Sequence, residues 1–275
     1  MNFIKMHGAG NDYIYIDCFN EAVENPESLA KKLSDRHFGI GADGIVLIKP
    51  SKKADCFMDI YNADGSRAEM CGNAVRCTAK YLYDNKIKNS IIKVETLSGI
   101  KSVEILTEND VAVGGRVNMG RPILNGHQIP TRYGDSIVKN KVLNIDNNDY
   151  EITCISMGNP HCVVFHNNIH KLNLEKIGPL FENHEMFPER INTEFAEVID
   201  KNYLKMRVWE RGSGETLACG TGACAVAVAS VINGLCSKNK EIKIRAKGGM
   251  LSVNWHENNN VYLSGNAVEV FRGEI

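Results

Sequence analysis

The sequence has almost no net charge. Its 32 basic and 33 acidic residues, among 275, leave a formal charge of −1 at pH 7. Such a balance gives no field that would hold nucleic acid or an anionic lipid surface, and no cluster of Lys and Arg stands out along the chain. We therefore expect no nucleic-acid or membrane partner, and a small molecule as the ligand.

The sequence also lacks a long apolar run. Its longest stretch of low polarity, residues 223–232, is half of the roughly 20 residues that a transmembrane helix needs. Residues 1–7 contain no apolar segment of the kind found in signal peptides. We therefore expect a cytoplasmic protein.

Motifs that hold metal ions are missing as well. Nine cysteines are present, but no two have the Cys-x-x-Cys spacing that would anchor a zinc site or a redox pair. His166 and His170 have the i,i+4 spacing of a helical metal pair, but Asn167 stands where a zincin carries its glutamate. We expect no metal ion, and most cysteines should be buried thiols.

What the sequence does contain is an internal repeat. Shifted by 148 residues, the chain matches itself at a Gly-Asn pair, a helical segment, a strand end and a Cys-Gly pair. The matches are Gly10-Asn11 with Gly158-Asn159, 26–33 with 174–181, Tyr61-Asn62 with Trp209-Glu210, and Cys71-Gly72 with Cys219-Gly220. Agreement at several positions in one order indicates a duplication, and hence an α+β protein of two similar halves.

Local signals mark where helices begin and end. Asn25 followed by Pro26 is a good N-cap and first-turn pair. The segment 223–232 is apolar nearly all round, so we expect a buried helix there. Asn233-Gly234 is a suitable end for that helix.

Each half contains a strand, a polar turn with glycine, and then a Cys-Gly pair that opens a helix. A cysteine at a helix N-terminus meets the positive end of the helix dipole, so we expect Cys71 and Cys219 to have lowered pKa values. The glycine that follows each cysteine leaves backbone N–H groups open to an incoming anion. For a lone cysteine a small buried residue is the usual interpretation, but two equivalent positions favour a functional one.

Two such turns facing each other would place a sulfur on either side of a small anionic substrate. One thiolate would remove a proton from the carbon next to a carboxylate, and the opposite thiol would deliver a proton to the other face. The helix N-termini would stabilise the charge that develops on the carboxylate. The pattern therefore predicts a racemase or epimerase that needs no cofactor.

The residues around the cysteines form specific motifs. They are Asn62-x-Asp64-Gly65-Ser66 with Cys71-Gly72-Asn73-Ala74-x-Arg76, and Glu210-Arg211-Gly212-x-Gly214-Glu215-Thr216-x-Ala218-Cys219-Gly220-Thr221-Gly222-Ala223. Others are Gly8-Ala9-Gly10-Asn11-Asp12, Arg36-His37-x-Gly39-Ile40-Gly41, Met157-Gly158-Asn159-Pro160-His161-Cys162 and Phe187-Pro188-Glu189-Arg190-x-Asn192. Together they resemble the motifs of the diaminopimelate epimerase family.

The resemblance implies a PLP-independent interconversion of LL- and meso-diaminopimelate, on the route to lysine and peptidoglycan, by a homodimer. It implies that Cys71 and Cys219 are the acid–base pair, and that His161 and Glu210 tune the thiols. The implied substrate-binding residues are Asn11, Asn62, Gly72, Asn73, Asn159, Asn192, Glu210, Arg211, Gly220 and Thr221. Independently of the family, Arg211 suits a distal carboxylate and Glu210 a distal ammonium.

The expected fold is thus α+β, with two pseudo-symmetric homologous halves and the active site in the cleft between them. Each half should be a mostly antiparallel sheet curled around a central helix. We expect the N-terminal half over residues 1–117, completed by a C-terminal strand at 265–275, and the C-terminal half over 118–264. The linker between the halves should lie near residues 116–120.

Other interpretations stay open at this point. Proline racemases and hydroxyproline epimerases are similar at the cysteines but carry His where Asn73 stands, and a non-catalytic amino-acid-binding protein could use the same cleft. For Asn11, Asn62 and Asn159 taken singly, the usual interpretation is an asparagine that caps a turn. For the adjacent Glu210 and Arg211 it is an exposed ion pair. Gly44 stands where some family members have Gln, so one substrate contact is absent here.

Overall fold

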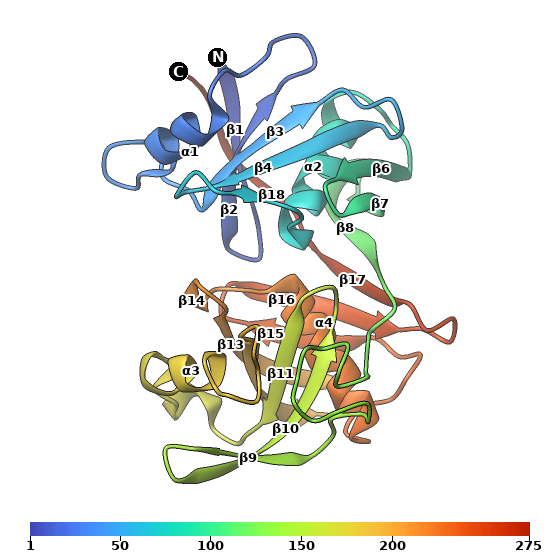
Figure 1. Cartoon of the computed structure of the whole chain (residues 1–275). Helices are drawn as coiled ribbons and strands as arrows, with labels where there is room; N and C mark the ends of the chain where they lie inside the picture. Colours follow the sequence, from blue (N-terminus) through green and yellow to red (C-terminus); the bar gives the residue numbers. More distant parts are fainter. The chain divides into compact units, whose positions relative to one another are not determined.

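The computed structural model describes the whole chain, residues 1–275. Its contacts divide the chain into two units (Figure 1). Unit 1 is Met1–Asn118 together with Ser264–Ile275, and unit 2 is Met119–Leu263. The blue and cyan strands of Figure 1 belong to unit 1, and the yellow and orange strands to unit 2.

Unit 1 is a mainly antiparallel sheet with two helices. Its strands are β1 (Asn2–Gly8), β2 (Asn11–Asp17), β3 (Gly44–Lys49), β4 (Cys56–Asn62), β5 (Arg67–Ala68), β6 (Ile91–Thr96), β7 (Gly99–Glu108), β8 (Val111–Gly120) and β18 (Val268–Glu274). The helices are α1 (Pro26–Ser34) and α2 (Gly72–Asn85). The strands pair in the order β18-β1-β2-β3-β4-β6-β7-β8, with β5 beside β4, and only β2–β3 and β4–β6 are parallel.

Unit 2 has the same kinds of element. Its strands are β9 (Lys141–Ile145), β10 (Asn148–Ser156), β11 (Pro160–Phe165), β12 (Asn192–Asp200), β13 (Tyr203–Glu210), β14 (Gly214–Thr216), β15 (Ile242–Ala246), β16 (Gly249–Trp255) and the first half of β17 (Val261–Asn266), whose residues from Ser264 on belong to unit 1. The helices are the 3-10 helix η1 (Ile169–Lys171), α3 (Leu174–Glu182) and α4 (Gly220–Ile232). The pairing order is β9-β10-β11-β12-β13-β15-β16, with β14 beside β13.

Seven strands of each unit pair in the same order when they are matched one to one, from β18 to β7 in unit 1 and from β9 to β16 in unit 2. The parallel pairs β11–β12 and β13–β15 of unit 2 correspond to β2–β3 and β4–β6 of unit 1. Helices α1 and α3 follow the first strand of the first parallel pair, while α2 and α4 lie between the strands of the second. The predicted α+β class, with two homologous halves built on antiparallel sheets, is therefore confirmed.

The second helix of each unit is its buried centre. Helix α2 packs against β1, β2, β6 and β7, and α4 packs against β10 to β13, β15 and β16. In α2 the apolar residues Val75, Ala79 and Leu82 are fully buried, and in α4 burial extends to the polar Ser230. Because strands from across the sheet touch one helix, each sheet curls around it, as the sequence predicts.

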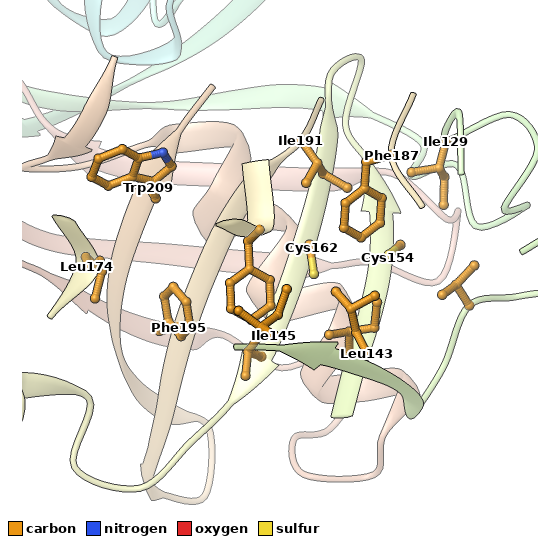
Figure 2. Close-up of a cluster of buried hydrophobic side chains, with 14 of the residues drawn as sticks. Ile129, Leu143, Ile145, Cys154, Cys162, Leu174, Phe187, Ile191, Phe195 and Trp209 are labelled. Atoms are coloured by element: carbon orange, nitrogen blue, oxygen red, sulfur yellow. The ribbon is translucent and has the colours of Figure 1, made fainter. Parts of the chain in front are cut away.

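The core of unit 2 supports the strand end that carries the second cysteine turn. Figure 2 shows aromatic rings from several elements in one buried cluster, among them Phe187, Phe195 and Trp209. Helix α3 approaches this cluster through Gly178, where an added Cβ would lie 2.3 Å from Trp209 Cδ2. Glycine is needed at this contact, because the indole ring occupies the place of a side chain.

Several local expectations are confirmed and others are corrected. The helices predicted over 26–33 and 174–181 are present as α1 and α3, and α4 ends at Asn233 with Gly234 at φ 75°. Asn25 precedes α1 but is left-handed, with φ 48°, and makes no side-chain cap. The segment 116–120, where a linker was expected, is the end of strand β8, and the boundary between the two units falls within it, after Asn118.

The spacing of His166 and His170, which the sequence analysis set aside as a metal pair, is not a helical spacing in the structure. His166 follows β11, and His170 lies in the short helix η1, so the two do not share a helical face. No group of three or more His, Cys, Asp or Glu side chains is arranged to hold a metal ion. None of the helices has the length and apolar character needed to cross a membrane.

Candidate active site

Each cysteine turn leads into a helix whose N-cap is the cysteine itself. The two N-cap residues have nearly the same extended backbone, with φ −137° and ψ 118° at Cys71 and φ −113° and ψ 118° at Cys219. Their carbonyl oxygens accept hydrogen bonds of 2.9 Å from Val75 N and Ala223 N. The repeat thus gives both thiols the same place on the backbone, at the positive end of a helix.

The Cys71 thiol lies in a network of asparagine side chains. Its Sγ donates to Asn11 Oδ1 at 3.2 Å, and Asn73 Nδ2 donates to the same oxygen at 3.3 Å. Asn73 in turn accepts from Arg76 Nη2 at 2.7 Å, and both of these side chains are buried. Two predicted substrate-binding residues, Asn11 and Asn73, therefore lie next to the first predicted catalytic cysteine.

The carboxylate of Asp43, just before strand β3, orients Asn11. Asp43 Oδ2 accepts from Asn11 Nδ2 at 2.8 Å, and Asp43 Oδ1 accepts from Arg36 Nη2 at 2.9 Å. Arg36 comes from one of the family motifs, and this contact gives it a structural reason. The amide of Asn11 is held with its nitrogen toward Asp43 and its oxygen toward Cys71.

Asn62 opens the turn that precedes Cys71. Its Nδ2 donates to Ser66 Oγ at 3.0 Å, and its backbone N–H donates to Ser66 O at 2.8 Å. Gly65 supplies the left-handed residue of this turn, with φ 85°. The side chain of Asn62 therefore stabilises the turn, and its contact with substrate stays a prediction.

The Cys219 sulfur lies against the first turn of its own helix. Gly222 N donates to Sγ at 3.4 Å, and Thr221 Oγ1 lies 3.4 Å from Sγ. Cys219 is buried, with 6% of its surface exposed, whereas Cys71 is partly exposed. Thr221, one of the predicted substrate-binding residues, thus contacts the sulfur through its side chain.

The acidity of Cys219 differs from the sequence expectation. Burial, followed by the negative charges of Glu210 and Glu194, raises the pKa of Cys219 well above its usual value. Hydrogen bonds from Thr221 and Gly222 act in the other direction without offsetting this. The expectation of a lowered pKa is therefore wrong for Cys219, because lost hydration outweighs the helix dipole.

Glu210, one of the two predicted thiol-tuning residues, ends strand β13. Its carboxylate accepts a hydrogen bond from Thr216 Oγ1. Burial raises the pKa of Glu210, against lowering contributions from Thr216, from Cys219 and from the charge of His161. The structure therefore brings Glu210 into electrostatic contact with the second cysteine.

His161, the other predicted thiol-tuning residue, forms a buried pair with a residue that the sequence analysis missed. His161 Nδ1 lies 2.7 Å from Glu194 Oε1, and both side chains are 0% exposed. On the far side of the ring, Nε2 lies 3.1 Å from Asn159 Oδ1. Asn159 is thus joined to His161, and both ring nitrogens have oxygen partners.

Asn192 connects three segments of unit 2. Its Oδ1 accepts from Arg211 N at 3.0 Å, and its Nδ2 donates to Pro160 O at 2.8 Å. The residue is 4% exposed. Its amide therefore fixes the backbone around Arg211 and around the His161 motif, and its own contact with substrate stays a prediction.

A second buried carboxylate holds the turn of Arg211 from the other side. Glu182, at the end of α3, accepts from Gly212 N at 2.9 Å and from Trp209 Nε1 at 2.8 Å. Arg211 itself donates from Nη1 to Glu189 O at 2.8 Å. The turn is thus anchored to the core, while the side chain of Arg211 is partly exposed.

The predicted backbone donors are the first residues of the two helices. Gly72 begins α2 and Gly220 begins α4, and both are buried. An added Cβ on Gly220 would lie 3.1 Å from Leu263 Cδ2. Glycine at these positions leaves the helix N–H groups uncovered by a side chain.

The structure also explains why position 44 has no side chain. A Cβ on Gly44 would lie 2.2 Å from Tyr61 O and 2.9 Å from Tyr13 Cε1. The ring of Tyr13 and the backbone of β4 therefore occupy the space that a Gln would need. Gly44 and Asn192, which the repeat matches, are the first residues of equivalent strands β3 and β12.

The chain is similar to known proteins over its full length. The sequence profile described as diaminopimelate epimerase matches residues 3–124 and 153–270. A diaminopimelate epimerase of Acetivibrio thermocellus is 55% identical over 277 residues, covering 100% of this chain and 98% of the relative. The one from Methanococcus maripaludis strain S2 is 52% identical, covering 100% and 99%.

A solved structure with little sequence identity shows the same fold. A phenazine biosynthesis protein of the PhzF family from Bacillus anthracis superposes with a TM-score of 0.71 at 16% identity, covering 100% of this chain and 98% of that one. The fold is thus shared more widely than the motifs. With its profile match and its full-length relatives at more than half identity, the chain belongs to the diaminopimelate epimerase family.

Proposed function

We propose that this protein is a diaminopimelate epimerase that interconverts the LL and meso isomers by two-base proton transfer between Cys71 and Cys219. The single observation that carries this proposal is the equivalence of the two cysteines. Each is the N-cap of the central helix in one half of a duplicated fold. Family membership supplies the substrate, since the relatives carry the name of this activity.

The proposed reaction needs one thiolate and one thiol. The thiolate removes the proton from the α-carbon, the thiol protonates the opposite face, and the two sulfurs exchange states with each turnover. The first N–H groups of α2 and α4, including those of Gly72 and Gly220, would stabilise negative charge on the α-carboxylate. A raised pKa at Cys219 supports its role as the proton donor in the resting enzyme.

The other predicted residues are assigned to binding and tuning. Asn11 and Asn73, which hydrogen-bond beside Cys71, would bind substrate there, and Asn159 and Thr221 would bind it from the second cysteine's half. Arg211 would hold the distal carboxylate of substrate, and Glu210 would serve both the distal ammonium and the thiol. Asn62 and Asn192, whose amides hold turns and backbone, complete the binding set.

The proposal includes a homodimer in the cytoplasm that uses no PLP or metal. Purified protein incubated with LL-diaminopimelate, without added PLP and with a chelator, should form the meso isomer, as measured by chromatographic separation of the isomers. Absence of the second isomer would refute the proposal. Binding without turnover would indicate an amino-acid-binding protein.

An isotope experiment tests the two-base mechanism. Started in deuterated water with one pure isomer, early product should carry deuterium at the inverted carbon, while recovered substrate carries none. This follows because a different sulfur serves each face of the carbon. Substantial transfer of the original proton into product would show a single base.

Specificity tests the role of Arg211. Lysine lacks the distal carboxylate, so it should lose a charge-assisted hydrogen bond worth about 1.5–3 kcal/mol and react far more slowly than diaminopimelate. Proline and hydroxyproline, the substrates of the alternative isomerases, should not react. Comparable turnover of lysine and diaminopimelate would remove Arg211 from its assigned role.

A further inference from the structure

Glu194 is a buried carboxylate that no motif of the sequence explains. It lies on the central strand β12, its side chain is 0% exposed, and its Oε2 is buried without a hydrogen-bond partner. Burying an ionised carboxylate costs several kcal/mol unless it is paired. Its only paired oxygen, Oε1, contacts His161.

The duplicated half shows that the fold does not require a carboxylate here. The repeat matches Glu194 with Val46, the third residue of the equivalent strand β3, which is also fully buried. The registers agree, because Val46 lies opposite Tyr15 and Glu194 lies opposite Val163 on the equivalent neighbouring strand. An apolar side chain therefore suffices at this place in the fold.

A second difference between the halves accompanies the first. A Cβ added to Gly222, in the first turn of α4, would lie 2.5 Å from Glu194 Oε1. The repeat matches Gly222 with Ala74, the corresponding buried residue of α2. Unit 1 thus combines Val46 with Ala74, and unit 2 combines the carboxylate with glycine, which makes room for it under the helix that Cys219 caps.

The contacts of His161 indicate what the carboxylate of Glu194 does. Both ring nitrogens face oxygen atoms, Glu194 Oε1 at 2.7 Å and Asn159 Oδ1 at 3.1 Å. A neutral imidazole has one N–H donor, whereas the doubly protonated ring donates to both partners. Glu194 is then the counterion of the imidazolium, and the charge of His161 acts on Glu210, which contacts Cys219.

We propose that Glu194 is a positioning residue of the epimerase, which holds His161 in one orientation and in its doubly protonated form below the N-terminus of α4. The inference rests on the proposed function and deepens it. Glu194 does not touch substrate in this account; it acts through His161, as a buried carboxylate orients an imidazole in other enzymes. The positive ring then offsets the carboxylates around Cys219 when that sulfur becomes a thiolate.

Two variants test the proposal. Glu194→Gln keeps the shape and removes the charge, while the double variant Glu194→Val with Gly222→Ala copies the packing of Val46 and Ala74. Both should fold, with kcat lowered by at least about 10-fold and KM changed by less than about twofold. The unfolding midpoint of the double variant should stay close to that of the wild type.

A spectroscopic readout does not depend on activity. In protein with ¹⁵N-labelled histidine, the ring signals of His161 are identified by their loss in His161→Gln, among the eight histidines of the chain. At neutral pH the wild type should show two protonated ring nitrogens for His161. Glu194→Gln should show one protonated and one unprotonated nitrogen.

The outcomes separate this inference from the proposed function. A wild type that forms no meso isomer refutes the function, and the ¹⁵N spectra still decide what Glu194 does to His161. An active wild type whose Glu194→Gln variant has unchanged kcat, or an unchanged His161 spectrum, overturns the inference alone. Failure of both variants to fold would also overturn it, since Glu194 would then be a structural residue.

Discussion

The two cysteine turns have the same backbone and different surroundings. Both cysteines are N-caps of central helices. Around Cys71 the partners are the amides of Asn11 and Asn73, the latter held by buried Arg76. Around Cys219 the charged neighbours are the carboxylates of Glu210 and Glu194. The two halves therefore share the backbone geometry at the cysteines, while substitutions at matched positions have changed the charges around the two thiols.

The same divergence appears in an ion pair that supports each turn. In unit 1 Arg67 Nε pairs with Asp59 Oδ1 at 2.7 Å, and in unit 2 Arg207 Nε pairs with Glu215 Oε1 at 2.7 Å. The shift of 148 residues matches Asp59 with Arg207 and Arg67 with Glu215. The pair has therefore kept its place while its two charges exchanged strands.

The first prediction tests whether the two thiols are equally necessary. Cys71→Ala and Cys219→Ala should each lower the rate of epimerisation by at least about 10³-fold, because inversion needs a proton donor or acceptor on each face. Steady-state assays of isomer formation check this. Cys224→Ala, a buried cysteine in the same helix as Cys219, should keep most activity. A variant of either proposed catalytic cysteine with near-normal turnover would break the assignment.

The second prediction compares the exchanged ion pairs. Arg207→Ala should lower the free energy of unfolding by about 2–4 kcal/mol, because Arg207 also donates to the carbonyls of Ile169 and Leu172, which would lose their partner. Arg67→Ala should cost less, about 1–2 kcal/mol, because the buried carboxylate of Asp59 keeps Lys49 as a partner. Urea denaturation of the two variants measures both values. Equal losses in the free energy of unfolding would show that the two ion pairs stabilise the protein equally.

The third prediction concerns the space under the second helix. Gly222→Ala alone should destabilise the protein by about 1–3 kcal/mol, since the new methyl group meets Glu194 Oε1. Adding Glu194→Val should restore most of this stability, because the equivalent residues of unit 1 are Val46 and Ala74. Thermal unfolding of the single and double variants provides the comparison. Additive effects of the two substitutions would contradict a direct contact.

The fourth prediction concerns the pH dependence of Cys219. An ordinary thiol with the reference pKa of 9.0 is half ionised at pH 9, and a raised pKa shifts ionisation to higher pH. Alkylation of Cys219 by iodoacetamide should therefore be at least about tenfold slower at pH 9 than that of an exposed model thiol. Mass spectrometry of digests taken over time measures the rate. A rate at pH 9 equal to that of the model thiol would show that the pKa of Cys219 is not raised.

Much of the fold was predictable from local patterns. The matched helices 26–33 and 174–181 have apolar residues at i,i+4 spacing, and the end of α4 is marked by Asn233 and Gly234. Asn25 shows the limit of such signals, since its left-handed backbone prevents the expected side-chain cap. Asparagine is common both as an N-cap and in left-handed backbone, so the residue type alone does not decide between the two.

Part of the candidate site was likewise predictable from the sequence, and part was not. Motifs identified both cysteines, but Glu194 was missed, because a Glu that directly follows the polar residues Asn192 and Thr193 looks solvent-exposed. The repeat carries the missing signal, a charged residue matched with Val46. The space at Gly44 could not be predicted either, because it is filled by Tyr13 and by the backbone of β4, which only the packed sheet brings there.

By itself the sequence determined the duplication, the helices that the two cysteines cap and the family, since all three depend on residue types at fixed spacing. Only the tertiary structure decided that Cys219 resists ionisation, that Asn192 serves the backbone, and that His161 is paired with Glu194. These properties depend on burial and on charges from distant segments. Desolvation and Coulomb interactions act through space, so spacing along the chain does not reveal them.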